Sequence, residues 1–161
     1  MVATVLWQLL IAAIFLILMN GARAEQEAFS FPAQGRNIMP ISVGKALLRP
    51  CSRPAPQDVS RFWEPTEMDI NNLEKQLVPY LAALQKAGIP LPPPGAYDRQ
   101  FIGIVLKGKK LIYSNFFPSG FRAFDPSQQA IDVCDGGPRH WGIVFDPRHR
   151  AFSNLSFSQM G

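Results

Sequence analysis

The sequence predicts an α+β fold in which one long N-terminal helix packs on an antiparallel meander sheet of four to five strands. Three observations predict it. Apolar residues recur at helical spacing over residues 66–87, strand-like runs and turn residues alternate after residue 100, and the connections between these runs are short. Short connections favour antiparallel pairing, and a sheet with one apolar face needs a covering helix.

Residues 1–24 have the pattern of a secretion signal. The run 2–19 is apolar except at Thr4 and Gln8, and Ala22 and Ala24 fit signal peptidase cleavage after Ala24. About 18 apolar residues would also span a bilayer as an uncleaved anchor, although no Lys or Arg cluster flanks the run. We therefore expect a periplasmic or extracellular mature chain without a stable membrane span.

The mature part, residues 25–161, is long enough for one domain with one core. The formal net charge is +4 for the whole chain. Cleavage of the leader would remove one charged side chain, Arg23. So small a charge is not that of a nucleic-acid-binding protein, and no nucleic-acid partner is expected. The lysines at 107, 109 and 110 form one local cluster, which a solvated hairpin tip explains better than an anion site.

Two cysteines, Cys51 and Cys134, lie in the mature part. An exported chain with an even count normally pairs them, so we expect a disulfide. The alternative is a reactive thiol at Cys134, since Asp135 and His140 are close in sequence. Nothing else in the chain supports that chemistry.

Residues 25–62 contain five prolines and no sustained period, and predict an extended arm that is wrapped over the domain or partly disordered. The α+β domain is expected over residues 63–161. Its helix has a capping box at Thr66 and Asp69 and a stop at Gly88, and Pro79 should bend or split it. The apolar face consists of Ile70, Leu73, Leu77, Leu81 and Leu84.

Five strands are expected after the helix, because β-branched and aromatic residues fill short runs between turn signals. A hairpin connection at Lys107-Gly108-Lys109 joins the first two, and Asp146-Pro147-Arg148-His149 fits a type I turn before the last. The strands are expected at residues 100–106, 110–116, 129–134, 140–145 and 150–157.

One helix followed by a curling antiparallel sheet resembles cystatin-like folds and other small secreted inhibitor domains. The likeness lies in the order of the elements, and no family motif accompanies it. It implies a fold and no particular activity.

The segment 134–142 is the most unusual in composition and supplies most of the candidate binding residues. Its glycines would let a ligand approach the backbone, with Asp135, Arg139 and His140 as polar partners and Trp141 as a stacking platform. A simpler reading is a hairpin loop with Trp141 buried against the helix. The other candidates are Phe117, Phe121 and Phe124, which either fill the core or form a protein-contact patch.

No motif specifies a cofactor, and His140 and His149 lack the neighbours of a metal site. The first functional hypothesis is an exported, non-catalytic protein-binding domain of the inhibitor or immunity type, acting through loops 117–126 and 135–140. A secreted factor that acts on other cells fits the same features. The alternative is a small exported hydrolase that uses His140 with Asp135 or Asp146.

Overall fold

The computed structural model describes residues 30–89, 91, 93–121 and 124–161. The predicted leader at 1–24 and the first residues of the predicted arm lie outside these ranges. Within the described part, no helix is long and apolar enough to cross a bilayer.

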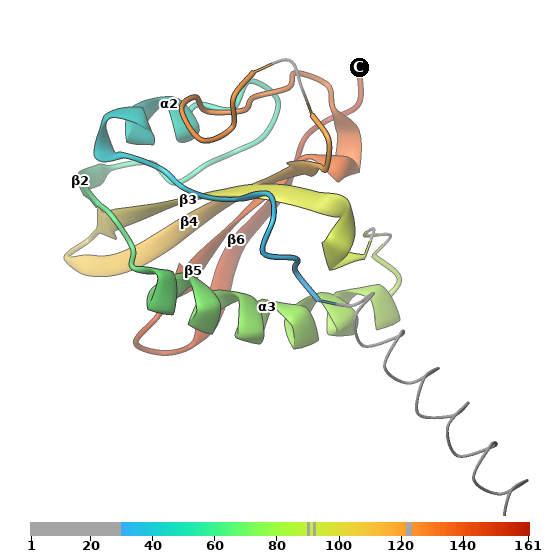
Figure 1. Cartoon of the computed structure of the whole chain (residues 1–161), viewed down its shortest axis with the longest axis horizontal. Helices are drawn as coiled ribbons and strands as arrows, with labels where there is room; N and C mark the ends of the chain where they lie inside the picture. Colours follow the sequence, from blue (N-terminus) through green and yellow to red (C-terminus); the bar gives the residue numbers. More distant parts are fainter. Residues whose placement is uncertain (1–29, 90, 92, 122–123) are drawn as a thin grey trace, which may run out of the picture.

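A mixed sheet of six strands forms the centre of the molecule (Figure 1). The strands are β1 (Arg36–Ile38), β2 (Val59–Trp63), β3 (Tyr97–Leu106), β4 (Lys109–Pro118), β5 (Trp141–Asp146) and β6 (Ala151–Phe157). Strands β3 to β6 pair antiparallel in succession. Strand β1 pairs parallel with the first half of β3, and β2 pairs antiparallel with its second half.

The predicted fold class is therefore wrong. The sheet is mixed, and the helix is not N-terminal to it, because β1, β2 and a short helical segment come first in the described chain. These elements belong to the segment that was expected to be an arm. Three residues of β1 carry no periodic signal, and their backbone partners are more than 60 positions away, at Arg99 and Phe101.

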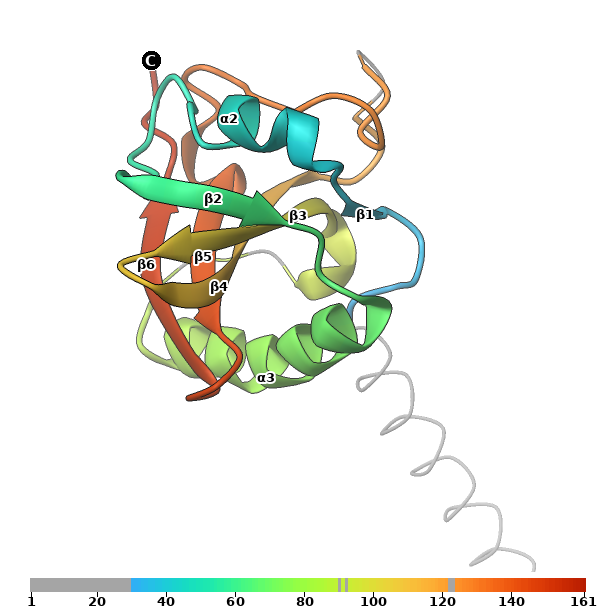
Figure 2. The same ribbon diagram turned by 90° about the vertical axis from the view of Figure 1, so that its left-hand side faces the viewer.

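The long helix α3 (Glu67–Lys86) covers one face of the sheet (Figure 2). Its capping box is present: the Asp69 backbone N–H donates to Thr66 Oγ1 over 3.2 Å, and the Thr66 N–H donates to the Asp69 carboxylate over 2.9 Å. The helix continues through Pro79, so the expected split does not occur. Its buried residues include Ile70, Leu73 and Leu77, as the spacing predicted.

The opposite face of the sheet is covered by the 3-10 turn η1 (Ile41–Val43), the short helix α2 (Gly44–Leu47) and the loop after β4 (Figure 1). Each face has its own hydrophobic cluster: the α3 core includes Ile70, Leu73 and Leu77 of the helix, and the α2 core includes Leu47 of the short helix. Neighbouring residues of β5 alternate between them, because Ile143 and Phe145 belong to the α3 core and Val144 to the α2 core. Because both faces are covered, β3 and β4 are almost continuously buried, and their polar residues Arg99, Gln100 and Asn115 lie in the interior.

The predicted strand at 129–134 is absent. The backbone of this segment is hydrogen-bonded by side chains and not by the backbone of a neighbouring strand. Gln100 Oε1 accepts from the Ile131 N–H over 2.9 Å, and Asn115 Nδ2 donates to the Ile131 carbonyl over 2.8 Å. Buried Arg53 donates to Tyr113 and Asn115. The place beside β4 belongs to β5.

Cys51 and Cys134 form a disulfide with a Cα–Cα distance of 5.4 Å. It joins the segment after α2 to the loop before β5, and both cysteines are exposed. A persistent exposed disulfide is consistent with an exported protein.

A buried ion network connects β1, α3 and β3. Arg99 is fully buried and donates through Nε to Glu74 over 2.7 Å. Its other two nitrogens donate to the backbone carbonyls of Gln34 (3.1 Å) and Pro32 (2.6 Å). The second Glu74 oxygen accepts from Arg36, which also reaches Glu67 on the surface over 3.1 Å.

We expect Glu74→Ala to lower the free energy of unfolding by about 3–5 kcal/mol, because it leaves Arg99 buried without a counter-ion. Glu67→Ala is the matched control: the Glu67 side chain is 70% exposed against 7% for Glu74, so its loss should cost no more than about 0.5 kcal/mol. Urea unfolding followed by circular dichroism measures both. Equal losses of stability in the two variants would contradict the role of Glu74 as the counter-ion of buried Arg99.

Candidate functional site

The candidate residues predicted at loops 117–126 and 135–140 divide into buried and exposed groups. Trp141 is fully buried, stacks on Phe116 at a centroid distance of 3.8 Å, and belongs to the α3 core. Phe117 is also buried and meets half-buried Phe121 edge to face. Trp141 is therefore no stacking platform, and the simpler reading of this residue is the better one.

The remaining predicted residues lie closer to the surface. Phe124 is 55% exposed, and Asp135 and Arg139 are exposed. His140 is half-buried: its Nδ1 lies 3.0 Å from the Gly136 carbonyl, and its Nε2 has no hydrogen-bond partner among the described residues. The part of the chain that the structure describes gives His140 no carboxylate partner.

The residues of the hydrolase hypothesis are not brought together. His140 and Asp146 stand at opposite ends of β5, which places their backbones roughly 20 Å apart at the rise of a strand. Asp146 instead bonds His149, whose Nδ1 lies 2.7 Å from Oδ2. This hydrogen bond lowers the pKa of the Asp146 carboxyl, and the N–H groups of Arg148 and His149 act in the same direction.

The structure assembles a different surface, which we call the basic turn pair. It consists of the β3–β4 turn, residues 107–110, and the β5–β6 turn, residues 146–150. Both turns lie at the same end of the sheet because β3 to β6 pair antiparallel in chain order. The lysines and arginines in it are Lys107, Lys109, Lys110, Arg148 and Arg150, all exposed.

Local chemistry fixes the shape of both turns. Lys107 and Gly108 have φ values of 50° and 76°, as the two central residues of a type I′ hairpin turn require. In the second turn, Asp146 Oδ1 accepts from the N–H groups of Arg148 (2.9 Å) and His149 (3.1 Å). The charged side chains are thus carried on constrained backbone.

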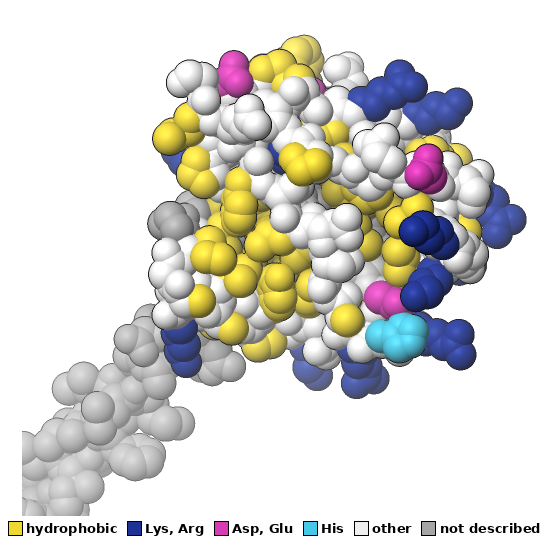
Figure 3. Space-filling model, turned by 180° about the vertical axis from the view of Figure 1, so that it is seen from behind, with side chains coloured by type: hydrophobic (Ala, Val, Ile, Leu, Met, Phe, Trp, Pro, Cys, Tyr) yellow, Lys and Arg dark blue, Asp and Glu magenta, His cyan; other side chains and the backbone are white. Residues whose placement is uncertain are grey.

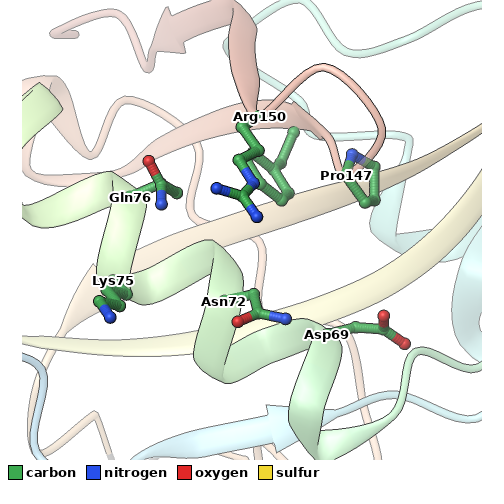
Figure 4. Close-up of a pocket in the computed structure, with 7 residues that line it drawn as sticks. Asp69, Asn72, Lys75, Gln76, Pro147 and Arg150 are labelled. Carbon is green, nitrogen blue, oxygen red and sulfur yellow. The ribbon is translucent and has the colours of Figure 1, made fainter.

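Two hollows flank the β5–β6 turn. The first, the turn hollow, has a volume of about 260 Å³ between the two turns, and is lined by Gly108, Lys109, Lys110, Asp146, Arg148 and His149. The second, the helix hollow, has about 270 Å³ between α3 and the β5–β6 turn, and is lined by Asp69, Asn72, Lys75, Gln76, Phe145, Pro147 and Arg150 (Figure 4).

Seen from behind, Lys and Arg side chains gather along the right-hand side of the molecule (Figure 3), over the end of the sheet where the β3–β4 turn lies. Asp146 contributes an acid within the turn hollow, but its carboxylate is already bonded to His149 and to two backbone N–H groups. The turn hollow therefore presents three cations that form no ion pair with a described residue, beside a carboxylate already hydrogen-bonded within its own turn, an arrangement suited to binding an anion.

Sequence reasoning identified the lysine cluster and the turn at residue 146 separately and did not join them. The available signal was the meander itself, since alternate hairpin turns of an antiparallel sheet lie at the same end. Asn72 and Gln76 carried no signal, because a polar residue on the outer face of a helix is ordinary.

Comparison of the chain with protein-family models, curated proteins and solved structures finds no match.

We expect Trp141→Ala to cost about 3–5 kcal/mol of stability, because it leaves a large cavity beside Phe116 in the α3 core. Phe124→Ala, at an exposed position, should change stability by no more than about 0.5 kcal/mol. Thermal unfolding of both variants tests this. A Trp141→Ala protein as stable as the parent would show that the tryptophan does not support the core.

We expect the burial of Tyr97 to make the free energy of unfolding depend on pH in the alkaline range. Burial raises the pKa of its hydroxyl to about 12, above the value of about 10 for an unfolded tyrosine. The folded state then holds the proton more tightly, so stability is complete below pH 10 and falls as the pH rises toward 12.

The test compares the parent with Tyr97→Phe in urea unfolding at pH values from 8.5 to 11.5. Tyr97 Oη has no hydrogen-bond partner among the described residues. The Tyr97→Phe variant loses no such bond and should therefore fold at neutral pH. It should lose less stability than the parent above pH 10. Identical pH profiles would contradict the raised pKa.

Proposed function

We propose that this chain is an exported, non-catalytic domain that binds another protein, as inhibitors and immunity proteins do, and that the basic turn pair is its contact surface. The single observation that carries the proposal is the convergence of three exposed cations, Lys109, Lys110 and Arg148, from two constrained turns around the turn hollow. The partner we expect presents an acidic loop or segment.

Rigidity supports binding by this surface. The two turns close hairpins in which β3, β4 and β5 are almost fully buried, so the cations are presented without a large ordering cost on association. Complementary charge would speed encounter and select acidic partners.

The surface proposed from sequence, at loops 117–126 and 135–140, has less support, because two of its largest side chains, Phe117 and Trp141, are in the core. Export supports a protein partner over a nucleic acid. We propose that the leader is cleaved after Ala24, and that the mature chain acts in the periplasm or outside the cell, where the Cys51–Cys134 disulfide persists.

Site-specific cross-linking in the native host tests this function. A photoreactive residue at position 148 of the full-length chain should capture one acidic protein. The double variant Lys109→Glu/Arg148→Glu should reduce affinity for that purified protein at least about tenfold, and added salt should weaken the parent's binding.

Arg139→Glu is the control, since Arg139 is exposed at the opposite end of β5, and it should bind as the parent does. Exclusive capture of nucleic acid or lipid would contradict the proposal. So would equal effects of the double variant and the control.

A further inference from the structure

The helix hollow lies on the other side of the β5–β6 turn and has its own chemistry. Arg150 extends from the turn toward α3, and its guanidinium lies between Asn72 and Gln76 (Figure 4). The apolar part of the lining is Pro147, with the edge of the buried Phe145 behind it. The hollow thus combines a cation, two amides and a small apolar surface.

The polar groups of this hollow are available to a ligand. Arg150, Asn72, Gln76 and Lys75 make no side-chain hydrogen bond or ion pair with any residue that the structure describes. The interior arginines differ: Arg99 and Arg53 each donate to two or more acceptors. Arg150 therefore has its hydrogen-bonding capacity directed into an open hollow.

The acid in the hollow, Asp69, forms no ion pair with Arg150 in the part of the chain that the structure describes. Asp69 accepts from the N–H of Thr66 (2.9 Å) and from its hydroxyl (2.7 Å), so its carboxylate is committed to the helix cap. Figure 4 shows its side chain pointing away from Arg150. Lys75 adds a second positive charge to the lining.

We propose that the helix hollow is a binding site for a carboxylate group attached to a small apolar body, with Arg150 as its bidentate partner. A guanidinium presents two parallel N–H donors that match the two oxygens of a carboxylate. The amides of Asn72 and Gln76 add a donor on each side, and the small apolar body contacts Pro147.

The size of the hollow restricts the ligand. A volume of about 270 Å³ is below the range of roughly 300–1,000 Å³ in which drug-sized ligands bind. It accommodates one carboxylate and a few carbon atoms. Such a group is found on a free small acid, at the C-terminus of a peptide, or on an acidic side chain next to an apolar residue.

Nuclear magnetic resonance titration of the full mature chain with defined probes tests the site. N-acetyl-leucine should shift the signals of Arg150 Nε and of the Asn72 and Gln76 side-chain amides, whereas N-acetyl-leucinamide, which lacks the carboxylate, should not. A blocked Gly-Glu-Leu peptide presents the carboxylate on a side chain. Its relative affinity distinguishes an acidic side chain from a terminal or free carboxylate.

Variants at position 150 separate charge from geometry. Arg150→Lys keeps the positive charge but loses the two parallel N–H donors of the guanidinium. It should weaken N-acetyl-leucine binding at least about tenfold. Arg150→Gly should abolish binding without unfolding the turn, because Arg150 has φ of 51°, a conformation that glycine adopts freely. Arg139→Glu, at the opposite end of β5, should bind N-acetyl-leucine as the parent does.

Three results would overturn the assignment: equal shifts with the acid and the amide, full binding by Arg150→Lys, or tighter binding of inorganic phosphate than of N-acetyl-leucine. None of them depends on the partner protein. Failure of the carboxylate site would therefore leave the cross-linking test of the basic turn pair unaffected, and failure of that test would leave this one standing.

Discussion

The carboxylate of Glu74 binds both Arg99 and Arg36, and these two ion pairs join α3, β3 and β1. An arginine in the middle of a covered sheet needs a counter-ion and full hydrogen bonding. Glu74 supplies the charge from α3, and the carbonyls of Pro32 and Gln34 supply the remaining acceptors. These bonds place the helix on one face of β3 and the segment before β1 along its edge, which explains the parallel pairing of β1.

A second buried hydrogen-bond network, which contains Arg53 but no acid, holds the other face of the sheet. Gln100 and Asn115 occupy the backbone groups of Ile131, and Arg53 closes this network against Tyr113. The Cys51–Cys134 disulfide holds the same loop covalently. A long segment without regular structure can therefore lie over the sheet with its backbone polar groups satisfied, which a buried loop requires.

The β3–β4 and β5–β6 turns, which lie outside this interior, carry charged side chains on a backbone of restricted conformation. The backbone at Lys107, Gly108 and Arg150 adopts the left-handed conformation, and Asp146 bonds the N–H groups of its own turn. Cations fixed in this way form one surface between the turns and another toward α3. The two hollows differ in chemistry: Lys109, Lys110 and Arg148 supply the cations of the turn hollow, whereas the helix hollow combines Arg150 and Lys75 with two amides.

The sequence by itself determined the elements whose signals are local. The spacing from Ile70 to Leu81 predicted α3 and its buried face, Thr66 and Asp69 predicted the cap, and the residues of β3, β4, β5 and β6 were recognisable from their composition. Tertiary structure alone decided that residues 36–38 pair with β3, that 129–134 is not a strand, and that Arg150 faces Asn72 and Gln76. The reason is physical: helix periods, caps and turns act between neighbours in the chain, whereas these features depend on bonds such as Arg99 to Glu74, between residues far apart in sequence.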